Sequence, residues 1–311
     1  DEDDRLASFW MDRLNLKLSL SLADITVGRQ AITFGKAYFW NPLDLFLPFD
    51  PRQFDQDYKA GVDACRMDIP LGDFSGINII GSLGREIDVS GDYAGGGRSF
   101  DASWYGSAMM ARYFTNLSEW DLSGQGGKIY GGYQLGAGAA GEIEPLAIRL
   151  EAAYLWADDS RPLPAPHDGD LVEDHLTAVV GLGHRFENSL DIEAEYLYNG
   201  SGDPGNLDAA LIRYGNGTRF HLGRHLAGVM AGYQFLPIIT GQLAGIYSFS
   251  DFSGQVMPRL TVSVSDESDL LIGALINMGK RPTGDFAFSP ELQSEFGTYP
   301  NIYYLELKVY F

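Results

Sequence analysis

Apolar and polar residues alternate along most of the chain. Near the amino terminus Leu14, Leu16, Leu18, Leu20 and Leu22 are separated by single polar residues. A period of two places every leucine on one face of a strand and every polar side chain on the other. The same alternation returns at intervals down to the last residues. The pattern predicts an all-β chain, and no helix-period segment of useful length competes with it.

Fifteen segments carry this alternation, most of them about ten residues long, which is the length a tilted strand needs to cross a bilayer. We predict strands at 12–22, 25–34, 59–71, 76–87, 103–114, 119–130, 133–143, 147–157, 175–186, 189–199, 225–236, 238–249, 255–264, 269–279 and 301–311. Bacterial single-chain barrels have an even number of strands. We therefore expect sixteen strands, with fourteen as the second choice, and the odd count means that a strand is split, missed or precedes Asp1.

The predicted connections alternate in length. Those at 23–24, 72–75, 115–118, 144–146, 187–188, 236–237 and 265–268 are short, whereas 35–58, 88–102, 158–174, 200–224 and 280–300 are long, with short exceptions at 131–132 and 250–254. Short turns at one end, long loops at the other and aromatic residues near both strand ends are typical of outer-membrane barrels. The sequence thus predicts one domain over 1–311, a transmembrane antiparallel up-and-down β-barrel of the bacterial outer membrane with short periplasmic turns and long extracellular loops. The alternative is a large soluble β-sandwich.

Two short motifs resemble known proteins. Residues 28–35 read GRQAITFG and residues 39–44 read FWNPLD. This stretch resembles Gram-negative outer-membrane porin-like β-barrels and, locally, alginate-export-like barrels. The terminal Phe311, which follows an alternating strand, is similar to the signal that the outer-membrane barrel assembly machinery reads. The resemblance implies a porin-like fold, an outer-membrane location and a role in transport.

If the apolar register faces lipid, the other register lines the interior of the barrel. Its charged members, which we predict to line a pore, are Lys17, Arg66, Asp68, Arg112, Asp121, Glu142, Arg149, Glu151, Arg185, Asp191, Glu193, Glu195, Arg259, Glu306 and Lys308. Such a lining can produce a transverse field that orients polar solutes in a wet channel. Alternatively the charges pair between neighbouring strands and fill a narrow interior. Pairing fits best for Arg185 with Asp191 and for Arg112 with Asp121.

The connection at 35–58 is unusually aromatic for a loop in water. Its large apolar side chains are Tyr38, Phe39, Trp40, Phe46, Phe49 and Phe54. Asn41 and Pro42 have the residue types of a helix N-cap and first helical position. We predict a short helix folded into or over the barrel mouth, where the aromatic residues form a constriction. The alternative is that they pack on the outer rim.

Composition excludes several other functions. Lys and Arg number 22 against 42 Asp and Glu, so the net charge is −20 and a nucleic acid partner is not expected. A lone cysteine, Cys65, excludes a disulfide framework and a Cys-based zinc site. Histidines are interpreted as solvated loop residues, at positions His167, His175, His184, His221 and His225. We predict no catalytic residues, no metal site and no cofactor.

These features predict a channel for passive diffusion of small hydrophilic solutes. Size exclusion by the aromatic loop and weak electrostatic selection by the wall charges would set its selectivity. A second hypothesis is a closed or plugged barrel that acts as a scaffold for a periplasmic or surface protein partner. A third is an exporter of an acidic polysaccharide, which the nearly neutral lining does not favour. The expected surroundings are outer-membrane lipid and lipopolysaccharide, and Phe311 would engage the assembly machinery.

Overall fold

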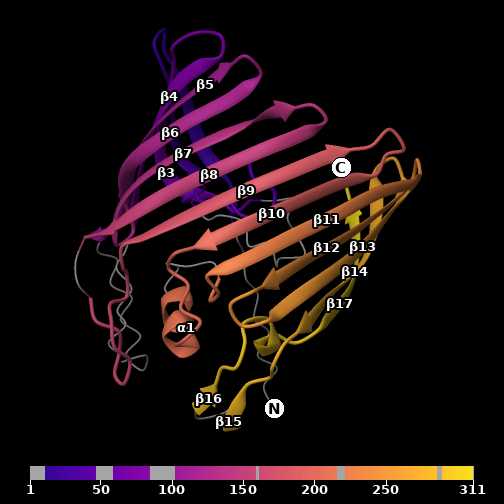
Figure 1. The fold of residues 1–311 in the computed structure, drawn as a ribbon. Coiled ribbons are helices and arrows are strands. Elements are labelled where there is room, and N and C mark those ends of the chain that lie inside the picture. The colour runs from indigo at the N-terminus through magenta and orange to yellow at the C-terminus, as the bar shows by residue number, and fades with distance from the viewer. Residues whose placement is uncertain are drawn as a thin grey trace, which may run out of the picture.

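A single curved sheet makes up most of the molecule. The computed structural model describes residues 11–46, 59–84, 102–158, 161–215, 221–285 and 289–310, so Phe49, Phe54 and Phe311 lie outside the described residues. Fifteen strands follow one another in chain order and each pairs antiparallel with the next (Figure 1). They are β1 (Leu14–Ser19), β2 (Asp24–Gln30), β3 (Val62–Pro70), β4 (Ser75–Gly84), β5 (Ser103–Leu117), β6 (Trp120–Ile129), β7 (Gly132–Ile143), β8 (Leu146–Ala157), β9 (His175–Arg185), β10 (Asp191–Asn199), β11 (His225–Leu236), β12 (Ile239–Ser248), β13 (Ser253–Ser265), β14 (Ser268–Met278) and β17 (Ile302–Val309). The predicted all-β, up-and-down antiparallel organisation is confirmed.

The two faces of the sheet differ in the way that the alternation predicts. Large apolar side chains stand exposed on the convex face, as shown by Leu16 at 76% and Leu305 at 70% exposure. Side chains of the opposite register are covered on the concave face, where Ile80 and Met110 are each 1% exposed. Because a strand presents successive side chains to opposite faces, a one-residue slip would exchange the two sets.

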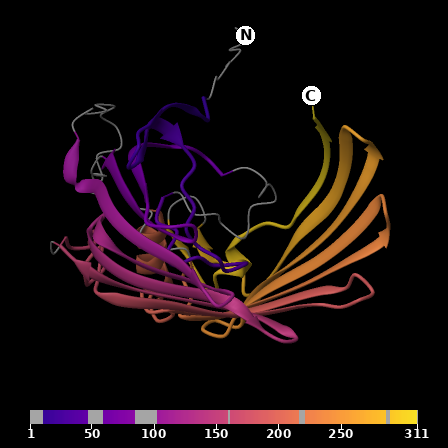
Figure 2. The same cartoon turned by 90° about the horizontal axis from the view of Figure 1, so that it is seen from above.

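The sheet is an open trough (Figure 2). Within the part of the chain that the structure describes, β1 and β17 form its two edges and the expected sixteen strands are not reached. Fourteen successive antiparallel pairings make β1 and β17 run in the same direction. A direct pairing of these two edges would therefore be parallel, unlike every other pairing in the sheet.

Short turns and long connections lie at opposite ends of the strands. The long connection after β10 contains a helix that the sequence pattern did not predict, α1 (Leu207–Gly215). Asn206 precedes it, and its side-chain oxygen accepts a hydrogen bond from the Ala209 amide at 3.2 Å, which is N-cap geometry. The connection after β14 forms a small hairpin of β15 (Thr283–Asp285) and β16 (Ser289–Glu291), followed by the 3-10 turn η1 (Phe296–Thr298). In the described ranges, every helix is too short or too polar to cross a membrane.

The concave face is covered by chain that returns from the long-loop end. Residues 31–46, which we call the inserted loop, contribute side chains to two buried clusters. One cluster joins Ile32, Phe34 and Phe46 to side chains of β3, β4, β5, β6 and β8. The other joins Phe39 and Trp40 to β9–β12 and to Phe296 of η1. The hydrophobic core therefore lies inside the trough, between the sheet and the inserted loop.

Candidate functional site

Two wall glutamates hold the inserted loop against the sheet. Glu151 on β8 is 4% exposed and accepts hydrogen bonds from backbone amides of the loop. Its Oε1 accepts from Lys36 N at 2.5 Å and Ala37 N at 3.3 Å, and its Oε2 accepts from Leu43 N at 3.3 Å. A buried carboxylate is costly unless its oxygens are hydrogen-bonded, and these amides supply the donors.

Glu195 on β10 does the same for the next stretch of the loop. It is 3% exposed, its Oε1 accepts from Tyr38 N, and its Oε2 accepts from Phe39 N at 2.8 Å and Trp40 N at 3.3 Å. We call Glu151 and Glu195 the carboxylate clamp. Together the two side chains satisfy six backbone donors that would otherwise be buried without partners.

Glycines on the concave face make room for the clamp and the loop. A Cβ on Gly181 would lie 3.0 Å from Oε1 of Glu195. A Cβ on Gly136 would lie 2.5 Å from Leu43, and one on Gly228 would lie 2.7 Å from the Phe39 ring. These glycines therefore leave the space that Glu195, Leu43 and Phe39 occupy, because only a residue without a side chain allows such close approach.

The expected helix at Asn41 and Pro42 is wrong. Residues 42–43 form a turn, closed by a 2.9 Å hydrogen bond from Asp44 N to Asn41 O. In an N-capped helix the Asn41 side chain would accept from the amide of Leu43 or Asp44. Here Glu151 accepts from Leu43 instead, and the Asn41 side-chain oxygen is buried without a hydrogen bond partner in the described part of the chain. The wall carboxylate thus replaces the local cap.

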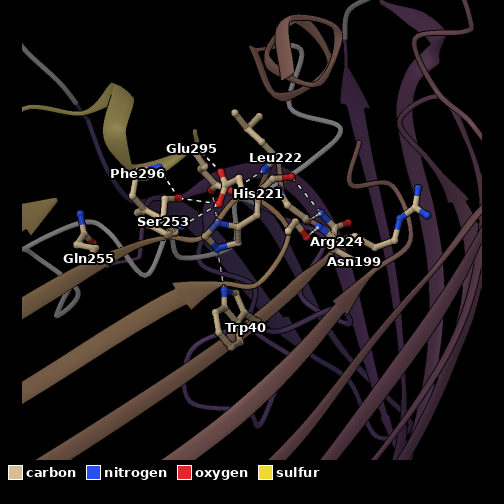
Figure 3. Close-up of polar contacts among 12 residues, drawn as sticks. Trp40, Asn199, His221, Leu222, Arg224, Ser253, Gln255, Glu295 and Phe296 are labelled. Atoms are coloured by element: carbon tan, nitrogen blue, oxygen red, sulfur yellow. Dashed lines mark hydrogen bonds and ion pairs between the residues drawn. The ribbon is translucent and has the colours of Figure 1, made fainter. Parts of the chain in front are cut away.

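A buried polar network joins the inserted loop to two other long connections (Figure 3). Trp40 Nε1 donates to His221 Nε2 at 2.8 Å, and His221 Nδ1 lies 2.5 Å from Oε1 of Glu295. Oε2 of Glu295 accepts from the amides of Leu222 and Gly223 at 3.0 and 3.1 Å. His221 and Glu295 are both fully buried. The connections after β2, β10 and β14 are therefore fastened to one another inside the trough.

This network corrects our interpretation of His221 as a solvated residue. Burial of an imidazole is tolerated because both ring nitrogens have partners. A Trp N–H donor requires an acceptor at Nε2, which assigns the proton to Nδ1, where it is donated to Glu295. With both nitrogens occupied and no exposure to solvent, His221 serves as a structural residue in this arrangement.

An ion pair is buried where the inserted loop returns toward β3. Lys59 Nζ lies 2.6 Å from Asp44 Oδ2 and donates to Ile32 O at 2.5 Å, and the two side chains are 5% and 2% exposed. Burial raises the pKa of Asp44 above its usual range, although the Lys59 ammonium opposes this effect. Burial likewise lowers the pKa of Lys59. Neither residue was singled out by the sequence pattern, because one charge in a loop gives no sign of its distant partner.

The charged residues predicted to line a pore all lie in the register opposite to the exposed apolar side chains. Arg149 pairs with Glu193 across β9, where Gly183 leaves space, and Arg66 pairs with Asp68 at 2.7 Å. Nearer the sheet edges or the turns are Lys17, paired with Asp24 at 2.7 Å, and Glu142, Arg185, Asp191, Glu306 and Lys308. The remaining member, Arg259, lies in the middle of β13 opposite Gln242. The cross-strand register places Asp191 opposite Arg185, as the pairing hypothesis expects.

Arg112 and Asp121 have other partners than the expected pairing. Asp121 accepts from Lys36 Nζ at 3.1 Å and from Asn116 Nδ2 at 2.9 Å. Arg112 donates to Asn78 Oδ1 at 3.3 Å, and its guanidinium lies 4.9 Å from the Phe34 ring centroid. The register explains the difference, because β5 and β6 pair Arg112 with Gln125 and Asp121 with Asn116. Lys36 from the inserted loop takes the place that Arg112 was expected to fill.

Of the predicted constriction residues, Phe39, Trp40 and Phe46 are buried in the trough and Tyr38 is partly exposed. The Tyr38 hydroxyl accepts a 2.6 Å hydrogen bond from Gln242 Nε2 on β12. Burial raises the pKa of Tyr38, which keeps its hydroxyl protonated. The structure thus places these side chains against the inner wall and not on an outer rim.

The motif at 28–35 fastens the start of the inserted loop. Gly28 has a φ of +118°, and a Cβ there would lie 2.4 Å from Leu14 O. Arg29 forms a two-pronged ion pair with Asp63 on β3, at 2.6 and 2.9 Å, and Gln30 Nε2 donates to Ala64 O at 3.1 Å. These contacts fix β2 between its two neighbours just before the chain turns inward.

No protein-family model matches the chain, and no curated protein matches it either. The resemblance of residues 28–44 to porin-like barrels therefore stays a prediction. In the described ranges, no group of three or more His, Cys, Asp or Glu side chains is placed to hold a metal ion.

Proposed function

We propose that this protein is a transmembrane β-barrel of a bacterial outer membrane that conducts small hydrophilic solutes past the inserted loop. The observation that carries the proposal is the opposite character of the two faces of the sheet. Large apolar side chains are exposed along strands from β1 to β17, whereas charged and hydrogen-bonded groups occupy the concave face. Soluble monomers rarely expose apolar patches above a few hundred Å². A bilayer is the solvent in which such a surface is stable.

Closure of the trough is part of the proposal. Because β1 and β17 run in the same direction, one further strand that is antiparallel to both would close the barrel and bring the count to sixteen. That number agrees with the even strand counts of bacterial barrels, and about sixteen strands enclose an aqueous passage. The short turns would face the periplasm and the long connections the exterior, as the assembly signal at the C-terminal strand implies.

The inserted loop would narrow this passage. It is held near the middle of the wall by the carboxylate clamp, and it places Lys36 and Tyr38 beside wall residues Asp121 and Gln242. Solutes would pass a mixed lining of paired charges and a tyrosine hydroxyl. Such a lining favours small polar molecules of either sign with weak charge selection.

Two measurements test the proposal separately. For membrane insertion, the exposed Cys65 on β3 carries a fluorescent label, and quenchers attached to lipid acyl chains should quench it. A matched variant, Cys65→Ala with Ser123→Cys, places the label on the concave face, where lipid quenchers should have little effect. Equal quenching at both positions would contradict a lipid-facing convex wall.

For conduction, the purified full chain is inserted into planar bilayers. We expect discrete openings, and larger ones in the double variant Glu151→Gln with Glu195→Gln, because the loop loses its attachment. Glu142→Gln is the matched control, since Glu142 is an exposed acid of the same wall. If neither the wild type nor the double variant shows conductance after insertion is confirmed, the proposal of a channel is refuted.

A plugged scaffold is the second candidate. It is favoured by the extent of buried apolar contact inside the trough, where Phe39, Trp40 and Phe296 close the space between β9–β12 and η1. In that case the inserted protein would be silent in bilayers, and release of the clamp would leave it silent.

A further inference from the structure

A cavity of about 680 Å³ lies at the short-turn end of the trough, below the inserted loop. Strands β5, β6, β7 and β8 form its wall, the loop forms its roof, and Phe74 and Asn116 mark its turn end. Pockets of this size accommodate small organic molecules. Its apolar surface comes from aromatic and aliphatic side chains, namely Phe34, Leu43, Phe74 and Phe114.

One charged group in this lining has no ionic partner. Arg112 projects from β5 between two phenyl rings, with its guanidinium carbon 4.9 Å from the Phe34 centroid and 5.3 Å from the Phe114 centroid. Its Nη1 donates to Asn78, and its Nε is buried without a hydrogen bond partner in the described residues. Among those residues the structure contains no carboxylate in an ion pair with Arg112. A partly buried guanidinium normally has such a counter-ion, because it loses hydration when it leaves water.

The acids of the cavity are already engaged by other donors. Asp121 accepts from Lys36 and Asn116, and Glu151 accepts from three amides of the inserted loop. Arg112 therefore has no counter-ion among the described residues, and an anion bound in the cavity would supply one. Guanidinium is suited to a carboxylate because its N–H groups form a fork that matches two oxygens.

We propose that this cavity binds a small organic carboxylate with an aromatic or aliphatic body. Its carboxylate pairs with Arg112, and its body packs against Phe74 and Phe114 at the turn end of the cavity. The proposal concerns binding from the short-turn side and holds whether or not solutes cross the barrel.

Binding to the full chain in detergent micelles tests this directly. The probe is 4-phenylbutanoate, and isothermal titration should detect saturable binding that weakens as salt is added. The neutral 4-phenylbutanamide and the cationic 4-phenylbutylamine should bind at least tenfold more weakly. Saturable binding of the amide or the amine as strong as that of the carboxylate would overturn the proposal.

Two variants locate the site. Arg112→Gln should weaken 4-phenylbutanoate binding at least tenfold, and Arg112→Lys should give an intermediate affinity, because the charge remains and the fork is lost. Arg185→Gln is the matched control, since Arg185 is another concave-face arginine at a short-turn end outside the cavity lining. If Arg112→Gln does not fold, Ser123→Leu reduces the cavity volume from β6 and should weaken binding similarly. Unchanged affinity in a folded variant at either position, or no binding to the folded wild type, would refute the site.

Discussion

Removal of one half of the carboxylate clamp should free the inserted loop while the sheet stays folded. The sharpest perturbation is Glu195→Gln, which is nearly isosteric. In the wild type, one carboxylate oxygen accepts from Tyr38 N and the other from Phe39 N and Trp40 N. A glutamine has one acceptor and one NH2 group, so whichever way it is turned, at least one loop amide faces another donor.

The magnitude follows from the number of hydrogen bonds affected. A buried donor left without an acceptor costs about 1–3 kcal/mol, and the bonds that remain lose the contribution of the charge. Against these losses, the neutral amide is cheaper to bury than a carboxylate. We expect the free energy of loop opening to fall by about 3 kcal/mol, which corresponds to about a 100-fold change in an equilibrium constant.

Hydrogen exchange resolved by mass spectrometry measures this opening. The amides of Tyr38, Phe39 and Trp40 should exchange about 100-fold faster in Glu195→Gln than in the wild type, if exchange follows the population of the open loop. Amides of β7 and β8 should keep their wild-type rates, as should all amides in the control Glu142→Gln. Unchanged exchange at residues 38–40 in the folded variant would refute the clamp, and faster exchange throughout the sheet would show that the variant unfolds the wall instead.

Two further changes test the packing of the inserted loop. Lys59→Met leaves Asp44 buried without its ion-pair partner and should lower stability by about 3–5 kcal/mol. The double variant with Asp44→Leu should recover much of the lost stability, because no buried charge is then left unpaired. Thermal unfolding in micelles measures both effects. Gly228→Ala should lower stability by about 1–3 kcal/mol, because the new Cβ would lie 2.7 Å from the Phe39 ring. Gly81→Ala should be close to neutral, because nothing lies within 4 Å of a Cβ at that position. Equal melting temperatures for the two alanine variants would contradict the close approach of Phe39 to Gly228.

The strands and their faces were readable from the chain itself. Alternation such as Leu14, Leu16 and Leu18 has a period of two, and this period alone assigns each side chain to one face of a strand. Turn positions followed as well, because the interruptions of the pattern coincide with Gly, Pro, Asn and Asp. The antiparallel order then follows from short connections, which join neighbouring strands.

The contacts inside the trough could not be predicted from the alternation of residues along the chain. Glu151 and Glu195 were recognised as concave-face residues, but their role depends on the path of a loop more than a hundred residues away in the sequence. The sequence favoured a helix N-cap at Asn41, whereas in the structure the Leu43 amide donates its hydrogen bond to Glu151. A local preference worth about 1 kcal/mol is easily outweighed when a buried carboxylate requires donors.

The sequence by itself determined that the chain forms one antiparallel sheet with an apolar and a polar face, because both properties depend on residues next to one another. Only the tertiary structure decided what occupies the polar face. His221 and Glu295 become partners because the curvature of the sheet brings the connections after β10 and β14 into one interior, and Asp44 and Lys59 become partners because the connection after β2 folds back on itself there. Burial then makes each polar group require a specific partner, and the identity of that partner depends on distances in space, which the spacing of residues along the chain does not contain.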